Sequence, residues 1–286
     1  MPGRNGGWST GSVVRRLQLG RALREMREGA GLSVETAAPR LDWSASKLSR
    51  IENGQQAVDV HGVRSMLDLY EGADRWDELL ELTRHTRQRG WWRAYGLDDK
   101  GYVPLEAEAT TVRDVTLGFV PGLLQTESYA RATFEGSVKR HTGGEIDRYV
   151  AVRLRRQRRL TSTDDPLTLV AIIDESVLHR QVGGREVMSD QRAQLVAVAR
   201  LPSVTLQVLP FAAGSHPALT AGFTLLSLGD LGVPDMAYVE HPIGAVHIDK
   251  ESDVARATLA LDRLRTLALS PDDSVALIER VATPTQ

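Results

Sequence analysis

The sequence predicts two domains of different fold class: a mainly α-helical N-terminal domain, followed by a larger α+β domain. Three observations predict this. Residues 13–82 carry apolar residues at helical spacing, punctuated by helix caps, and they contain no strand pattern. Short apolar runs typical of strands begin only after residue 160, and helical segments lie between and after them. A chain of 286 residues is long enough for a core in each domain.

We expect a flexible leader at 1–12, a helical domain at 13–82, a linker or hinge at 83–104, an α+β domain at 105–282 and a tail at 283–286. The leader is rich in Gly and Ser and has no apolar core segment, so it is not expected to be a signal peptide. The chain has no cysteine, which excludes disulfides and thiolate metal sites. It also has no apolar run long enough to cross a bilayer, and a cytoplasmic location is expected.

The first predicted helix starts at Val13 and ends at the glycines at positions 29 and 31, with Leu19 and Leu23 on its apolar face. Ser33 is a typical N-cap, so a short second helix is expected from there to about Leu41. After a tight turn, the N-cap Ser44 opens a third helix.

The third helix is expected to end at Asn53-Gly54, which is a C-terminal signal. Asp59 caps a fourth helix, and Asp74 a fifth. Five short helices in about 75 residues, with a tight turn between the second and third, are the layout of a helix-turn-helix domain. We therefore expect the third helix to enter the major groove of DNA, and a dimer to bind a two-fold operator.

In such a domain, residues near the start of the third helix reach base edges, and helix N-termini hold phosphates. The predicted base-facing residues are Ser44, Ala45, Ser46, Lys47 and Arg50. The predicted phosphate contacts are Ser33, Arg15, Arg16 and Arg40. The alternative is that Ser44 only caps the helix, while Lys47 and Arg50 lie on a solvated face. Glu52 is expected to bind Arg24 or Arg27 rather than DNA, whose phosphates would repel it.

The charge distribution agrees with one DNA-facing surface. The net charge is −2, but residues 1–56 contain nine Lys or Arg against five acids, whereas residues 57–81 contain two against seven. A basic region beside an acidic one suits a molecule that meets phosphate on one side only.

The C-terminal domain is predicted from alternating helical and strand patterns. The predicted strands are Leu167–Ile173, Val204–Leu209, Phe223–Leu228, Met236–Glu240 and Ala245–Ile248. The predicted helices span 105–117, 126–135, 144–160, 186–200, 251–268 and 271–282.

Several segments resemble one family of regulators. The run from Gly31 to Gly54 resembles the helix-turn-helix of Xre or λ-repressor-type proteins. Further segments resemble the WhiJ-like Xre regulators of actinobacteria, and they are 90–96, 105–109, 120–126, 204–211, 214–217 and 238–241. The resemblance implies an antitoxin-like regulator whose C-terminal domain of unknown function pairs with a small acidic BldB-like protein that modulates DNA binding. As a cytoplasmic DNA-binding protein, it is expected to be associated with the nucleoid.

The second helix departs from the Xre pattern at three positions. Val34 stands where many members have Gln, and Asp42 stands where the turn usually has Gly. Asp tolerates positive φ better than most residues. Pro39 lies inside the second helix and, because it lacks an N–H, is expected to distort the last turn.

Two groups of residues are candidates for binding a partner protein. The first is the tryptophan pair of the linker, Trp91 and Trp92. The second is a set of arginines in one helix, which are Arg153, Arg155, Arg156 and Arg159. An arginine-rich face could dock an acidic partner. The alternatives are that the tryptophans pack between domains and that the arginines are a solvated surface.

Two further constellations were weighed against structural roles. A metal site could assemble from His216, Glu240, His241 and Asp249, but no helical His pair or HExxH pattern supports it. The pair Asp174-Glu175 could act in a nuclease, but carboxylates at strand ends commonly cap helices. We expect no enzymatic activity, no cofactor and no metal.

Three functions therefore remain in order of preference. The first is a regulator controlled by a small acidic protein, the second is a one-component regulator that senses a small molecule, and the third is an enzyme tethered to DNA.

Overall fold

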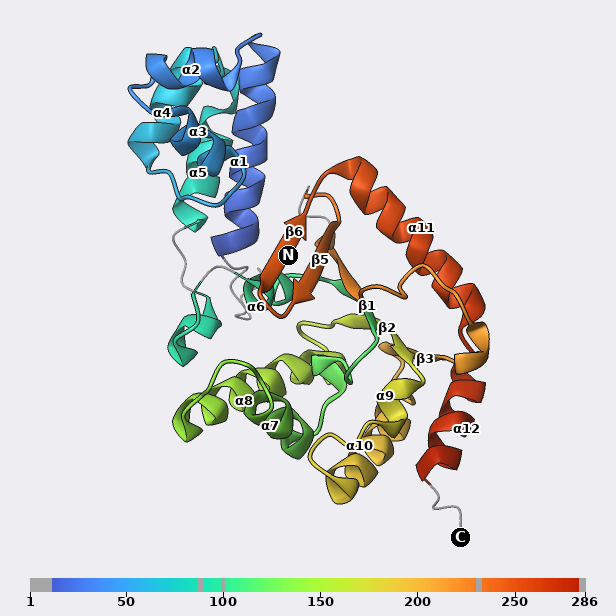
Figure 1. Cartoon of the computed structure of the whole chain (residues 1–286). Helices are drawn as coiled ribbons and strands as arrows, with labels where there is room; N and C mark the ends of the chain where they lie inside the picture. Colours follow the sequence, from blue (N-terminus) through green and yellow to red (C-terminus); the bar gives the residue numbers. More distant parts are fainter. Residues whose placement is uncertain (1–11, 87–89, 99–100, 230–232, 283–286) are drawn as a thin grey trace. The chain divides into compact units, whose positions relative to one another are not determined.

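The structure is a computed structural model that describes residues 12–86, 90–98, 101–229 and 233–282 (Figure 1). It divides into two compact units. The first runs to Glu108 and includes 228–233, and the second comprises Ala109–Ser227 and Pro234–Gln286. The predicted tail at 283–286, and all but the last residue of the predicted leader, lie outside the described residues. None of the helices in those ranges combines the length and apolar character needed to cross a bilayer.

The first unit contains the five predicted helices. They are α1 (Ser12–Gly29), α2 (Val34–Arg40), α3 (Ala45–Glu52), α4 (Val60–Leu69) and α5 (Trp76–His85). One apolar core joins them, and its centre includes the fully buried Leu23, Leu48, Val63 and Leu79. Asp59 caps α4 as expected, by accepting the Gly62 N–H (2.7 Å). The expected cap Asp74 instead lies in a 3₁₀ turn before α5, η1 (Ala73–Arg75), and makes no capping bond.

The turn between α2 and α3 has the conformation that its sequence predicts. Ala37 and Ala38 are fully buried. Small side chains are needed at these positions, because larger ones would push the two helices apart. Asp42 has φ of 55°, which is the left-handed conformation expected at the position where related turns carry glycine. Pro39 lies inside α2, and bonds from Leu41 to the Ala38 carbonyl and from Asp42 to the Pro39 carbonyl close the end of the helix. The i→i−3 spacing of these bonds marks a tightened last turn, in agreement with the expected distortion.

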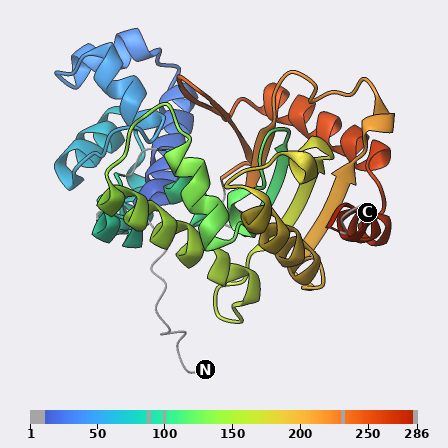
Figure 2. The ribbon, with the colours of Figure 1, turned by 60° about the horizontal axis from the view of Figure 1, so that its bottom comes forward.

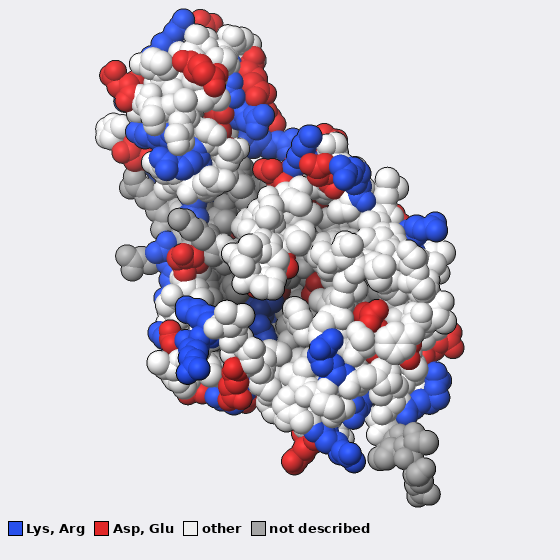
Figure 3. Space-filling view, in the orientation of Figure 1, with Lys and Arg blue, Asp and Glu red and all other residues white. Residues whose placement is uncertain are grey.

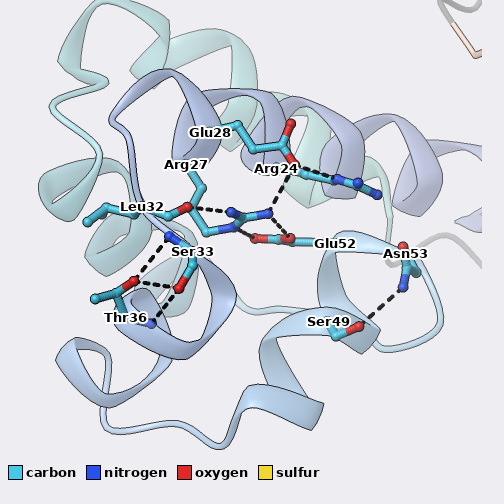
Figure 4. A network of polar contacts seen from close by, with 9 residues as sticks. All are labelled: Arg24, Arg27, Glu28, Leu32, Ser33, Thr36, Ser49, Glu52 and Asn53. Atoms are coloured by element: carbon cyan, nitrogen blue, oxygen red, sulfur yellow. Dashed lines mark hydrogen bonds and ion pairs between the residues drawn. The ribbon is translucent and has the colours of Figure 1, made fainter.

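A buried ion pair joins α1 to α3 (Figure 4). The Arg27 guanidinium donates to Glu52 through Nε (2.7 Å) and Nη2 (3.0 Å), and both side chains are at most 5% exposed. Arg27 also donates to the Leu32 carbonyl, which belongs to the connection before α2. The hydrogen bond to Glu52 raises the pKa of Arg27, so this guanidinium stays protonated. Of the two partners predicted for Glu52, Arg27 is confirmed, and Arg24 pairs with Glu28 at the surface.

A close backbone approach stands beside this ion pair. A Cβ on Gly20 of α1 would lie 2.5 Å from the carbonyl oxygens of both Ile51 and Glu52. Only glycine fits at this position, because the last turn of α3 lies directly on α1.

Two short elements complete the first unit in the predicted linker, 83–104, and just after it. They are η2 (Trp91–Tyr95) and α6 (Tyr102–Glu106). The last residues of α5 also fall within 83–104, so much of that segment has regular structure.

The second unit is built on a six-stranded sheet in the order β3-β2-β1-β4-β5-β6. The strands are β1 (Thr111–Thr116), β2 (Thr168–Asp174), β3 (Val204–Leu209), β4 (Phe223–Ser227), β5 (Met236–His241) and β6 (Gly244–Ile248). β1, β2 and β3 are parallel, whereas β4, β5 and β6 pair antiparallel. The sheet is therefore mixed, and β2 to β6 match the five predicted strands to within one residue.

Helices cover both faces of this sheet (Figure 2). They are α7 (Glu127–Glu135), α8 (Gly143–Gln157), α9 (Ser176–His179), α10 (Arg185–Val198), α11 (Glu251–Leu267) and α12 (Pro271–Ala282). Short 3₁₀ turns are η3 (Gly122–Leu124), η4 (Arg158–Thr161) and η5 (Phe211–Ala213). α11 packs Leu261 and Leu264 against Val115, Ile172 and Leu225 of the sheet. The predicted fold class, a helical domain and an α+β domain, is confirmed.

The helix expected at 105–117 is wrong. α6 ends at Glu106, and β1 begins at Thr111. β1 is rich in β-branched residues, and it pairs with β2 on one side and β4 on the other. As a strand, this segment forms backbone hydrogen bonds with neighbours on both sides. Their stabilisation exceeds the weak helical preference that the spacing of its apolar residues indicated.

We expect Gly20→Ala to destabilise the first unit, although alanine ordinarily stabilises a helix by about 1 kcal/mol relative to glycine. The added methyl group has no space beside the Ile51 and Glu52 carbonyls. All five tryptophans precede residue 93, so tryptophan fluorescence during urea unfolding reports on this unit. Gly29→Ala in the same helix is the control, because a Cβ there meets nothing within 4 Å. Equal stabilisation by both substitutions would contradict the close approach.

We expect Glu52→Ala to lower the free energy of unfolding of the first unit by about 3–5 kcal/mol, because it leaves the Arg27 charge buried without a partner. The double variant R27M/E52M should lose less than the two single losses together, since no buried charge remains. Urea unfolding followed by tryptophan fluorescence measures each variant. Arg24→Ala, which breaks an exposed pair, should cost less than about 1 kcal/mol and is the control.

Candidate nucleic-acid interface

The third helix presents a polar face away from the core. Leu48 and Ile51 are buried beneath it, whereas Ser44, Ser46 and Arg50 are exposed. The predicted contact Ala45 is exposed too. This arrangement leaves the predicted base-facing residues accessible on one short helix, with no acidic side chain on its outer face, because Glu52 turns inward to Arg27.

Ser44 has a structural role as well as the predicted contact role. Its Oγ accepts a hydrogen bond from the Lys47 N–H (3.1 Å), which caps α3. An exposed hydroxyl that caps the helix keeps a free lone pair and its proton. The cap and a DNA contact are therefore compatible.

Lys47 is held at one side of the helix. Its Nζ lies 3.9 Å from the centroid of the Trp43 ring, which is a cation–π contact. Trp43 in turn leaves little space beside Gly62 of α4, where a Cβ would lie 3.2 Å from the ring. Trp43, in the turn before α3, thus positions the Lys47 ammonium. The sequence pattern identified Lys47 but not this contact with Trp43.

Two more residues of this face were not predicted. The Asn53 side-chain amide donates to Ser49 Oγ (3.3 Å), and both residues are partly exposed. Ser49 and Asn53 follow Ser46 by three and seven positions, which is the spacing of one helix face. That spacing in the sequence could have found them.

The start of α2 is closed by a reciprocal capping box (Figure 4). Ser33 Oγ accepts from the Thr36 N–H (3.1 Å), while Thr36 Oγ1 accepts from the Ser33 N–H (3.1 Å). The predicted phosphate contact Ser33 is exposed at this end. Thr36 does here what Glu or Gln does in the usual capping box.

The other predicted phosphate contacts lie at different ends of their helices. Arg40 is exposed at the end of α2. Arg15 and Arg16 lie near the start of α1, close enough to Glu108 for their charges to lower its pKa. Burial dominates at Glu108, however, and raises the pKa of this carboxyl to about 8. The structure thus places Arg15 and Arg16 near Glu108.

The arginines of the second unit have internal contacts. Arg153 donates to Gln125 Oε1 (2.5 Å) and stacks over the Phe134 ring (4.4 Å). Arg159 donates to the Ala109 carbonyl and pairs with Asp165 (2.8 Å). Arg156 is buried, and Arg155 is partly buried.

Within the arginine-rich segment 148–159, Arg148 and Arg158 are exposed. Elsewhere charges are mixed: Figure 3 shows Lys and Arg interspersed with Asp and Glu over this view of the surface. Of the predicted tryptophan pair, Trp92 is buried and Trp91 is partly buried. Their rings meet edge to face at 6.0 Å.

The carboxylates at the end of β2 bind backbone groups. Asp174 Oδ1 accepts the Ser176 N–H (2.9 Å), and Glu175 Oε2 accepts the Phe211 N–H (2.7 Å). The first bond lies within the turn after β2, and the second joins that turn to the segment after β3. Among the described residues, no three His, Asp or Glu side chains gather as a metal site would require.

Comparison with known proteins assigns both parts of the chain to families. A family model described as a helix-turn-helix domain matches residues 18–82. A second model, described as a domain of unknown function (DUF5753), matches residues 100–280. Neither a curated protein nor a solved structure matches the chain significantly. The two matched domains support an Xre-like helix-turn-helix regulator. Because the second match covers well over half of the residues, the chain belongs to the DUF5753 family.

Proposed function

We propose that this protein is a sequence-specific transcription regulator whose helix α3 reads the major groove of an operator. The observation that carries the proposal is the exposed polar face of α3, with Ser46 and Arg50 outward and Leu48 and Ile51 in the core. The helix-turn-helix match over residues 18–82 supports DNA as the partner. Direct readout needs such side chains within reach of base edges.

We propose further that a homodimer binds a two-fold operator, because helix-turn-helix domains read half-sites one helical turn apart. The second unit then receives the regulating signal. We assign it a small acidic protein partner, in an antitoxin-like pair, which docks on the exposed Arg148 and Arg158. This choice differs from the four arginines singled out in the sequence, because internal contacts or burial engage those side chains.

We propose no catalytic role for the second unit. The carboxylates of Asp174 and Glu175 accept backbone N–H groups, and such bonds stabilise the loops that follow β2 and β3.

We expect the double variant K47A/R50A to bind the promoter of its own gene at least about tenfold more weakly than the parent, since each lost contact is worth about 1–3 kcal/mol if it reads a base. If both side chains contact phosphates instead, the slope of log affinity against log salt should fall by about 1.8. Electrophoretic mobility shift across a salt series measures both quantities.

The control for this experiment is Arg84→Ala, which removes an exposed arginine of α5 that pairs with Glu81 of its own helix. It should leave the affinity and the salt slope unchanged. Unaltered binding by K47A/R50A, with the tryptophan fluorescence of a folded first unit, would contradict the proposed role of α3.

We expect the charge-reversed variant R148E/R158E to lose a small acidic protein that copurifies with the parent chain from its native cells. Affinity purification of the full chain, followed by mass spectrometry for proteins and metabolites, measures this. The control is R256E, which reverses an exposed arginine on α11 instead. A copurifying metabolite in place of a protein would favour the small-molecule sensor. If neither a protein nor a metabolite copurifies, the proposal that this unit receives a regulating signal is overturned.

A further inference from the structure

The two edges of the sheet are treated differently. At one edge, the Val208 N–H of β3 donates to Ser274 Oγ (2.9 Å), and the Val208 carbonyl accepts from the Leu269 N–H (2.9 Å). The Gln207 amide also donates to the Leu269 carbonyl (2.9 Å). The connection from α11 to α12 therefore closes this edge, which prevents a further strand from pairing there.

The other edge, β6, is open. Residues 244–247 are all exposed, and no hydrogen bond from their backbone to any element besides β5 occurs among the described residues. The strand has the sequence Gly-Ala-Val-His-Ile, without Lys, Pro or an acid. Sheet edges usually carry such residues to prevent pairing with another chain, and β6 has none.

Exposed apolar side chains lie along this edge, and Glu240 of β5, opposite Ala245, is exposed as well. Ile243 at the hairpin tip is 92% exposed, and Val246 is 48% exposed. Figure 3 shows the region over β5 and β6 as a largely uncharged part of this view. The His247 and Tyr238 rings lie tilted to each other with their centroids 5.1 Å apart, and desolvation lowers the pKa of His247, so the strand carries no charge at neutral pH.

The hairpin register defines which backbone groups point outward. His241 pairs with Gly244 across a two-residue loop, so this pair exchanges hydrogen bonds. Since bonding directions alternate along a strand, Gly244, Val246 and Ile248 bond to β5. The N–H and C=O groups of Ala245 and His247 then point away from the sheet.

We propose that β6 pairs antiparallel with β6 of a second copy of this chain, about a two-fold axis at Val246. This inference rests on the proposed function, in which a dimer binds a two-fold operator, and it names the surface that forms the dimer. Ala245 of each copy then exchanges hydrogen bonds with His247 of the other, which uses all the outward backbone groups of the strand.

The strand is complementary to itself in this register. Val246 lies opposite Val246 of the second copy, and Gly244 lies opposite Ile248. No two like charges face each other, and an isologous contact of this kind closes into a dimer rather than a fibre. A strand from another protein could use the same edge, but the two-fold match of hydrogen bonds and side chains favours the second copy.

The dimer should be weak in the absence of DNA. Five residues of edge strand bury far less than the roughly 800 Å² per partner of a standard stable interface. An operator with two half-sites would hold two chains together and raise their effective concentration, which compensates for the small contact.

The experiment uses the charge variants Val246→Lys and Val246→Glu in the full chain, without DNA. Each alone places like charges opposite each other at the two-fold axis, and we expect its dimer dissociation constant to rise at least about tenfold. An equimolar mixture of the two should restore dimers to within about threefold of the parent. Sedimentation equilibrium over a concentration series measures all three, and circular dichroism verifies the fold.

The matched control is Leu259→Lys, an exposed apolar residue of α11 outside the strand edge, which should dimerise as the parent does. A parent chain that stays monomeric up to the highest concentration at which it is soluble, a V246K chain that dimerises like the parent or a mixture that fails to recover would each overturn the β6 pairing. The DNA-contact variant K47A/R50A should still dimerise, so failure of DNA binding and failure of this interface are separate results.

Discussion

The buried ion pair between Arg27 and Glu52 sets how α3 lies on the rest of the helix-turn-helix unit. A charged pair with so little exposure is stable only when both partners are in place, because either charge alone would be desolvated without compensation. Arg27 extends the constraint by donating to the Leu32 carbonyl before α2. Tyr70 packs near the pair, and burial followed by the Glu52 charge raises the pKa of its hydroxyl. One guanidinium therefore links three segments of the unit.

This constraint explains why the outer face of α3 is free to bind. Glu52 is the acidic residue of α3, and its carboxylate is turned inward to Arg27. The contact with Gly20 brings the last turn of α3 onto α1, while the Ser44 cap defines its first turn. With both ends fixed, the positions of Ser46 and Arg50 follow from helical geometry. Preorganised side chains lose less entropy when they bind DNA.

In the second unit, arginine has a different role. Arg153 and Arg159 bind Gln125 and Asp165, so these cations stabilise the packing of α8 and η4 against neighbouring segments. The unit also closes one sheet edge with Leu269 and Ser274, whereas no such contact covers the outer edge of β6 in the part of the chain that the structure describes. Such asymmetry has a physical consequence, since an open edge presents its N–H and C=O groups in the pattern with which another strand pairs.

The amino-acid sequence by itself determined the features that depend on a few neighbouring residues. The caps at Ser33 and Ser44, the left-handed Asp42 and the tightened turn at Pro39 involve residues one to three positions apart, so local chemistry predicts them. The same holds for β2 to β6, whose apolar runs are strong. The candidate interface was therefore largely predictable, except for Ser49, Asn53 and the Trp43 contact to Lys47.

The tertiary structure alone decided the rest. β1 became a strand because it pairs with β2 and β4, which are more than fifty residues away in the sequence. The partners of Arg153 and Arg159, and the closure of one sheet edge but not the other, depend on the same kind of distant pairing. A pattern of neighbouring residues does not predict such contacts. They require long loops to close, and the entropy cost of that closure is offset only when the whole sheet has formed.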